Sequence, residues 1–141
     1  MKDSPEFAVF TTRRIAIVEG DRTAAEMLHT FLRLMDLECS LVDPSNQSSE
    51  SVIDTLRRFD PQAVILDFDL PHLRALELAH EIRCALPDVA IVFASDTDPL
   101  PAADAPLVRK PRESFEGMLL LLEVVLDQET HEPSPEGEGG A

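Results

Sequence analysis

Short apolar segments that end abruptly at polar residues alternate with amphipathic segments along most of this chain. Three of them, residues 15–18, 63–66 and 89–94, consist entirely of apolar side chains, many of them β-branched. Unbroken apolarity over so few residues is typical of strands that are covered on both faces. Residues 39–42 and 107–108 predict two weaker strands.

Helical spacing of apolar residues fills the intervals between these strands. Helices are expected over residues 23–35, 51–59, 72–86 and 113–126. Strands that alternate with helices in this way form parallel sheets, because each connection has to cross from one end of the sheet to the other. The sequence therefore predicts an α/β fold with a five-stranded parallel sheet and helices on both faces.

Size and charge limit the partners that this chain can have. A length of 141 residues with 44% hydrophobic side chains suffices for one domain core. The 27 acids outnumber the 12 Lys and Arg, and the net charge of −15 repels nucleic acid and anionic membrane surfaces. The longest apolar run has five residues, far below the roughly 18 that span a bilayer. Only two cysteines and an acidic N-terminus predict a cytoplasmic protein.

Composition divides the chain into three parts. Residues 1–12 precede the first strand and are predicted to be an N-terminal extension. Residues 13–126 contain all the predicted strands and helices. Residues 127–141 combine acids, prolines and glycines with almost no apolar side chains, so we expect a disordered acidic tail.

Polar side chains that can carry chemistry follow four of the five predicted strands. These residues are Glu19 and Asp21, Asp67 and Asp69, Ser95, and Lys110. The carboxyl ends of parallel strands meet at one edge of a sheet, so we expect these side chains to converge. Carboxylates are natural ligands of Mg²⁺, and Asp67 could then act as a nucleophile toward a phosphoryl group. Lys110 and Ser95 could hold the phosphoryl oxygens.

Four segments in this order resemble the motifs of a response-regulator receiver domain, the phosphoacceptor of two-component signalling. They are residues 15–21, 63–71, 91–95 and 109–111. The resemblance implies a flavodoxin-like, doubly wound sheet and a Mg²⁺ cofactor. It implies a histidine kinase or phosphotransfer protein as the partner.

The resemblance also assigns a role to each candidate residue. Asp67 would accept the phosphoryl group, Lys110 would be the family's lysine and Ser95 its switch hydroxyl. Glu19 would be the first acid of the metal site, and Asp69 would offer a backbone carbonyl to the metal.

The metal site departs from the receiver pattern. The family's second Mg²⁺-binding acid falls on Gly20, so we expect weakened Mg²⁺ binding. The adjacent Asp21 either replaces that ligand or begins the following helix, where an acid suits the helix dipole. We favour the second alternative. The family's aromatic residue that reports phosphorylation falls on Leu107.

A deletion separates the last two strands. Residues 96–109 number 14 and have to include the fifth strand, and three of the others are prolines. Because prolines disfavour helix interiors and a typical helix needs about 11 residues, the receiver's fourth helix is predicted to be missing or reduced to a loop.

The final helix has more apolar residues than one packed face requires. Eight of the nine residues at 118–126 are apolar. The excess predicts a homodimer through the 113–126 helix, and the alternatives are local rearrangement around the missing helix or a wide core face.

Two signalling functions and one enzymatic function are consistent with these patterns. The first is a stand-alone receiver that is phosphorylated on Asp67 and signals by protein contact. The second is a phosphorylation-independent pseudo-receiver that acts as a dimerisation or adaptor module, which Gly20, Leu107 and the deletion favour. The Asp-x-Asp pattern at Asp67 and Asp69 also resembles haloacid-dehalogenase-type phosphatases. Those enzymes usually have this pattern at their first strand, so we do not expect an enzyme.

Overall fold

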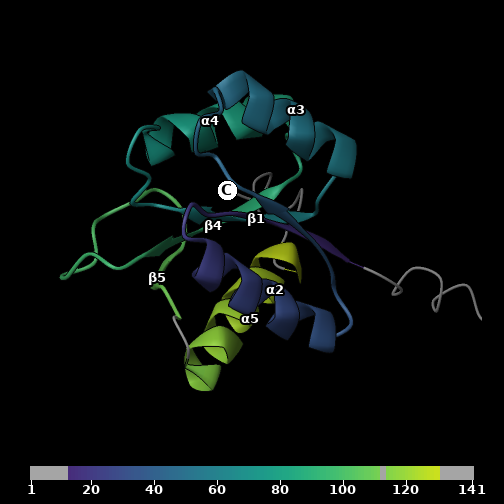
Figure 1. Cartoon of the computed structure of the whole chain (residues 1–141). Coiled ribbons are helices and arrows are strands. Elements are labelled where there is room, and N and C mark those ends of the chain that lie inside the picture. Colours follow the sequence, from purple (N-terminus) through teal and green to yellow (C-terminus); the bar gives the residue numbers. More distant parts are fainter. Residues whose placement is uncertain (1–12, 112–113, 131–141) are drawn as a thin grey trace, which may run out of the picture.

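The computed structural model describes residues 13–111 and 114–130 of the chain. The extension expected at 1–12 lies outside the described residues, as do residues 131–141 of the expected acidic tail. The described part contains one parallel sheet in the order β2-β1-β3-β4-β5 (Figure 1). Its strands are β1 (Arg14–Val18), β2 (Glu38–Val42), β3 (Ala63–Asp67), β4 (Ala90–Ser95) and β5 (Leu107–Arg109). This confirms the predicted five-stranded, doubly wound α/β fold.

Among the described residues, four helices cover the sheet from both sides (Figure 1). They are α2 (Arg22–Leu34), α3 (Ser49–Phe59), α4 (Ala75–Ala85) and α5 (Phe115–Thr130). Neighbouring side chains along a strand point to opposite faces, and β1 illustrates the consequence. Ala16 and Val18 pack in the core beneath α3 and α4, whereas Ile15 and Ile17 pack in the core beneath α2 and α5.

The position of each strand explains its composition. All five residues of β3 in the centre are buried, and in β1 the residues from Ile15 to Val18 are at most 1% exposed. β2 lies at the edge, and its Glu38 and Leu41 are exposed. The apolar runs that the sequence shows most clearly are therefore the central strands, which helices cover on both faces.

Residues 96–106 contain no helix, which confirms the predicted loss of the helix between β4 and β5. Ala103 and Ala105 of this segment pack against the core beneath α3 and α4. An ion pair joins Asp104 to Arg83 of α4 at 4.0 Å, and another joins Asp98 to Arg109 at 3.4 Å. The segment 96–106 is thus joined to the rest of the domain by apolar contacts and ion pairs although it contains no helix.

The final helix differs from its expected limits. α5 ends at Thr130, so residues 127–130, which we assigned to the disordered tail, are helical. Its apolar surplus is mostly used in the core: Met118, Leu121, Leu122 and Val125 are buried. The wide core face therefore explains most of the composition.

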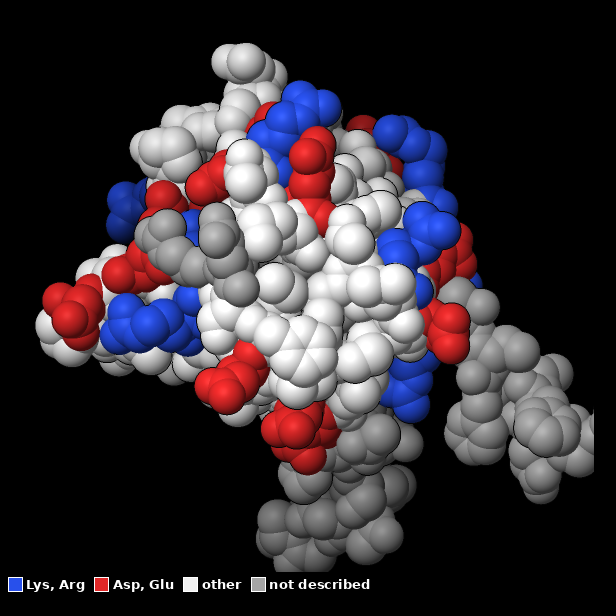
Figure 2. Space-filling model, turned by 60° about the horizontal axis from the view of Figure 1, so that its bottom comes forward, with Lys and Arg blue, Asp and Glu red and all other residues white. Residues whose placement is uncertain are grey.

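Two large apolar side chains of α5 remain at the surface. Phe115 is 61% exposed and Leu120 is 55% exposed. On the face that α2 and α5 form, uncharged side chains gather in the middle, with charged residues around them (Figure 2). Within the part of the chain that the structure describes, no helix combines the length and apolarity that crossing a bilayer requires.

Candidate functional site

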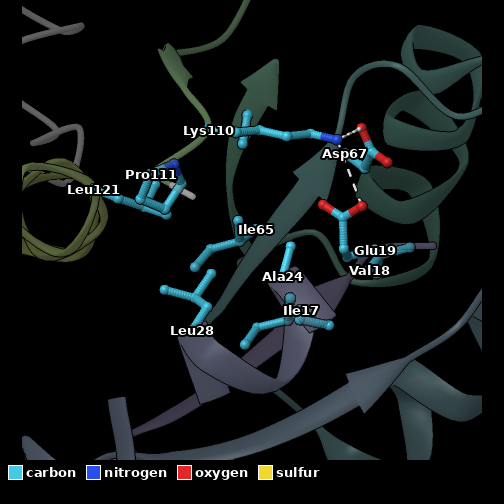
Figure 3. Close-up of a pocket in the computed structure, with 12 residues that line it drawn as sticks. Ile17, Val18, Glu19, Ala24, Leu28, Ile65, Asp67, Lys110, Pro111 and Leu121 are labelled. Atoms are coloured by element: carbon cyan, nitrogen blue, oxygen red, sulfur yellow. Dashed lines mark hydrogen bonds and ion pairs between the residues drawn. The ribbon is translucent and has the colours of Figure 1, made fainter. Parts of the chain in front are cut away.

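Three of the predicted residues meet in one ion-paired group at the carboxyl edge of the sheet (Figure 3). The ammonium Nζ of Lys110 lies 2.9 Å from Oδ1 of Asp67 and 3.4 Å from Oε2 of Glu19. The side chains are only 13%, 5% and 10% exposed, respectively. One lysine thus compensates two nearly buried carboxylates, as the convergence of strand ends predicts.

Strand pairing fixes where these three side chains stand. Asp67 is the last residue of β3, and Glu19 and Lys110 each follow directly after a strand. The backbone N–H of Glu19 donates to the backbone carbonyl of Val42 at 3.1 Å. The backbone N–H of Lys110 donates to the backbone carbonyl of Ser95 at 2.9 Å. Both residues are therefore held in the sheet hydrogen-bond pattern, and their side chains project from its edge.

Burial is the largest single influence on the pKa values of Glu19 and Lys110. It raises the pKa of Glu19 to about 7; the negative charge of Asp67 adds to this effect, and a hydrogen bond from the backbone of Asp21 opposes it. Burial alone would lower the pKa of Lys110, but the hydrogen bond to Asp67 and the charge of Glu19 outweigh it, so that pKa is raised. Lys110 therefore stays protonated, and Glu19 gains or loses its proton near neutral pH.

A small cavity of about 20 Å³ lies beneath the ion pairs. Apolar side chains of β1, α2, β3 and α5 form most of its wall, among them Ile17, Leu28 and Leu121 (Figure 3). This volume is comparable to the space that one water molecule occupies. The ion-paired group thus lies against apolar side chains, which explains the strong effect of burial on its pKa values.

Asp69 forms a second polar group with Ser95 and the residues after β4. Its Oδ1 accepts hydrogen bonds from the hydroxyl of Ser95 at 2.9 Å and that of Thr97 at 3.0 Å. Its Oδ2 accepts one from the backbone N–H of Asp96 at 2.8 Å. Burial tends to raise the pKa of Asp69, but these three hydrogen bonds outweigh it and hold that pKa below its ordinary value.

The sequence predicted that the side chain of Asp69 lies at this edge of the sheet, but it did not predict the hydrogen bonds that its carboxylate accepts from Ser95, Asp96 and Thr97. The backbone N–H of Asp69 donates to Oδ1 of Asp67 at 2.8 Å, so Asp69 joins the two polar groups. The available signal was the pair of hydroxyls at Ser95, the last residue of β4, and Thr97, two residues after it; β4 is the strand that neighbours β3.

Comparison with known proteins gives the fold a family context. No protein-family model matches this chain. The regulatory protein LuxO of Vibrio vulnificus, in strains YJ016 and CMCP6, is 25% identical over 77 residues, which are 55% of this chain. The chain covers only 16% of the length of LuxO.

Solved structures match over most of the chain. The CheY-like receiver domain from Methylobacillus flagellatus has a TM-score of 0.65 and 19% identity, covering 82% of this chain and 99% of its own. The response regulator TrrA of Thermotoga maritima, in complex with Mg²⁺-BeF, has a TM-score of 0.64 and 20% identity, covering 80% and 98%. TrrA is also solved in complex with the histidine kinase ThkA. The chain has the fold of a response-regulator receiver domain.

At the position of the receiver's second metal-binding acid, Gly20 contributes no side chain. Asp21 does not converge on the ion-paired group: its carboxylate accepts from the backbone N–H of Ala24 at 3.3 Å and caps α2. This is the helix-start alternative that we favoured. A Cβ built on Gly20 would meet only the hydroxyl of Ser45, at 3.7 Å, so the backbone has room for a side chain there.

The remaining donors of this receiver fold suit Mg²⁺, though in reduced number. Mg²⁺ in proteins is commonly held by one or two carboxylates together with waters and phosphate oxygens. Glu19 and Asp67 both approach Lys110 and so supply two such carboxylates close together. Among the described residues, no group of three or more acids, histidines or cysteines is arranged to hold a metal ion. The donor set is consistent with a weak Mg²⁺ site that relies on two carboxylates.

His72 lies at the margin of the site. Its Nε2 lies 2.7 Å from the backbone carbonyl of Pro44. This contact joins the loop after β3 to the loop after β2, next to the edge that carries Asp67. His72 therefore has a structural part in holding two site loops together.

Proposed function

We propose that this domain accepts a phosphoryl group on Asp67 from a histidine kinase or a phosphotransfer protein and signals by protein–protein contact. The observation that carries the proposal is the contact of Lys110 with Asp67 at 2.9 Å, at the end of the central strand. A carboxylate held next to a fixed ammonium is suited to phosphoryl transfer, because the cation also offsets the negative charge of the incoming group.

The proposed step forms one bond and breaks one. A carboxylate oxygen of Asp67 attacks the phosphorus of a phosphohistidine, and the phosphorus–nitrogen bond breaks, returning its electron pair to the imidazole. The product is an acyl phosphate on Asp67. Lys110 and the backbone N–H of Asp69, which both donate to Oδ1 of Asp67, would orient the carboxylate. Mg²⁺ bound by Glu19 and Asp67 would neutralise phosphoryl charge.

The proposed partner and location rest on separate observations. TrrA, which has the same fold, is solved in complex with the histidine kinase ThkA, and this supports a kinase partner here. The two cysteines, Cys39 and Cys84, form no disulfide, which agrees with a cytoplasmic location. The acidic surface supports neither nucleic acid nor membrane as a partner.

The alternative is a pseudo-receiver that acts as a dimerisation or adaptor module without phosphorylation. Gly20 and the absence of a helix between β4 and β5 favour it, because both remove parts that receivers use. The exposed Phe115 and Leu120 support a homodimer through α5 in either case.

Asp69 argues against the phosphatase alternative. The second acid of the Asp-x-Asp pattern in those enzymes has to donate a proton. Hydrogen bonds from Ser95, Asp96 and Thr97 hold the pKa of Asp69 below its ordinary value, which opposes the uptake of the proton that this role requires.

The mass of the intact protein after incubation with acetyl phosphate and Mg²⁺ tests the proposal. The wild type is expected to gain one phosphoryl group, and Asp67→Asn none. Asp88→Asn, at an exposed turn between α4 and β4, is the matched control and should behave as wild type. An unmodified wild-type protein would exclude phosphoryl acceptance and leave the adaptor function.

A further inference from the structure

The carboxylate of Asp69 holds the hydroxyl of Ser95 and the first residues after β4 in one hydrogen-bonded group. Ser95 and Thr97 both donate to Oδ1, and the backbone N–H of Asp96 donates to Oδ2. The contacts span 2.8 to 3.0 Å, within the range of good hydrogen bonds. Asp69 therefore links the end of β3 to the beginning of the segment 96–106.

The hydroxyl of Ser95 has no second proton to donate while it is hydrogen-bonded to Asp69. A serine hydroxyl has one proton to donate, and Ser95 gives it to Asp69. The oxygen of Ser95 in turn accepts the backbone N–H of Thr97 at 3.0 Å. Ser95 is 0% exposed, so water does not offer it another partner. To donate to a phosphoryl group on Asp67, Ser95 would first have to leave Asp69.

The position of Ser95 in the sheet lets Asp69 and a phosphoryl group on Asp67 compete directly for its hydroxyl. Asp67 is in register with Ala94, so Ser95 is the next residue along the neighbouring strand. The same Asp69 that takes the proton of Ser95 also donates its backbone N–H to Asp67. One residue thus contacts both the proposed acceptor and the proposed switch hydroxyl.

We propose that Asp69 is a positioning residue that holds the Ser95 hydroxyl away from the acceptor and thereby shortens the lifetime of a phosphoryl group on Asp67. The proposal rests on phosphoryl acceptance by Asp67. It also links the site to the segment 96–106: when Ser95 turns toward the phosphoryl group, Asp69 loses one of the donors that join it to this segment. No helix is present in 96–106 to hold the backbone in place, so these hydrogen bonds matter more than they would at a helix start.

The test is a double-mutant cycle on the rate of phosphoryl loss. Wild type, Asp69→Ala, Ser95→Ala and the double variant are each loaded with acetyl phosphate, transferred to buffer without it, and weighed over time. Asp69→Ala is expected to slow phosphoryl loss roughly three- to tenfold, the effect of one additional hydrogen bond. In the Ser95→Ala background the same substitution should change the rate by less than about twofold, because Asp69 acts through Ser95.

The conservative variant and the control give further readouts. Asp69→Asn keeps one oxygen that can accept from Ser95, so its rate should fall between those of wild type and Asp69→Ala. Asp88→Asn should leave the rate unchanged. Equal slowing by Asp69→Ala with and without Ser95 would overturn the proposal and indicate a direct effect of charge. An unchanged or faster loss in Asp69→Ala would overturn it as well.

Hydrogen exchange on the unphosphorylated proteins separates this proposal from the proposed function. Asp69→Ala should accelerate exchange of the amides of Asp96 and Thr97, and Ser95→Ala that of Thr97, since these contacts need no phosphoryl group. Unchanged exchange would contradict the positioning role even if Asp67 is phosphorylated. Faster exchange, with no phosphoryl group gained by any of the four proteins, would uphold the contact and reject phosphoryl acceptance.

Discussion

The ammonium of Lys110 lies 2.9 Å from Oδ1 of Asp67, and both side chains are nearly buried. The same ammonium also compensates Glu19, at 3.4 Å. Removal of Lys110 would therefore leave two carboxylates close together, next to apolar side chains and without a positive charge. Burial of a charge without its partner is among the most destabilising changes in a folded protein. Lys110 is thus expected to contribute to stability as well as to chemistry.

We predict that Lys110→Met lowers the free energy of unfolding by about 2–3 kcal/mol at pH 7.5. This is less than the loss of a fully buried partner, because the site retains some contact with solvent. Urea denaturation followed by circular dichroism measures the change. Arg22→Gln, which removes an exposed ion pair with Glu26, is the control and should cost less than about 0.5 kcal/mol. Equal losses in the two variants would contradict a buried role for Lys110.

The raised pKa of Glu19 predicts how the stability of the protein depends on pH. Burial raises the pKa of Glu19 in the folded protein to about 7, above the ordinary glutamate value of 4.5. Between these values the folded state binds the proton and the unfolded state has released it. Stability therefore falls as pH rises from about 4.5 to about 7, and Glu19 contributes nothing further to the slope above that range.

Unfolding free energies of wild type and Glu19→Gln, measured at several pH values from 5 to 8, test this dependence. The variant should be more stable relative to wild type at pH 8 than at pH 5, by on the order of 1–2 kcal/mol after allowance for partial solvent contact. Glu50→Gln, an exposed residue of the first turn of α3, should show no such difference. A constant offset between Glu19→Gln and wild type across this range would show that Glu19 ionises normally.

Gly20→Asp is predicted to strengthen Mg²⁺ binding. A Cβ at this position meets only Ser45, at 3.7 Å, and the described part of the chain has no glycine with positive φ, so a side chain fits without strain. A third carboxylate beside Glu19 and Asp67 should tighten Mg²⁺ binding roughly tenfold, because affinity for hard cations rises with the number of charged ligands. Isothermal titration calorimetry with MgCl₂ measures the change.

Gly20→Asn is the matched control for this prediction. Asparagine has the size of aspartate and lacks its charge, so its gain in Mg²⁺ affinity should be much smaller. Indistinguishable affinities in Gly20→Asp, Gly20→Asn and wild type would mean that position 20 does not face the ion.

The strand ends explain which parts of the site could be predicted from the sequence. Asp67 directly follows an apolar run and Lys110 lies two residues after another, and parallel pairing brings such ends to one edge, so their meeting needs no knowledge of side-chain conformations. The position of Asp21 at the start of α2 was also predictable, because short polar side chains at helix starts accept hydrogen bonds from backbone N–H groups. The missing helix followed from the length and prolines of one segment.

The contacts of Asp69 could not be predicted in the same way. They depend on the side-chain rotamer of Asp69 and on the path of residues 96 and 97 after β4, and neither leaves a periodic pattern in the sequence. The end of α5 was misplaced for a related reason: Asp127 and Gln128 lack apolar character, but helix propagation from a packed segment needs only ordinary propensity. Composition therefore predicted a tail where the helix continues to Thr130.

The exposed apolar residues of α5 give the last prediction. If Leu120, which is 55% exposed, and Phe115, which is 61% exposed, form a homodimer contact, the wild type should sediment as a dimer at micromolar concentration. Leu120→Gln should then sediment as a monomer without loss of stability, because Leu120 is not part of the core. Leu76→Gln is the matched control: this residue is 46% exposed but lies on α4, on the opposite face of the sheet, and should leave the dimer intact.

Because the net charge of −15 opposes self-association, added salt should favour the dimer. A wild type that sediments as a monomer at low and high salt would exclude a homodimer through α5.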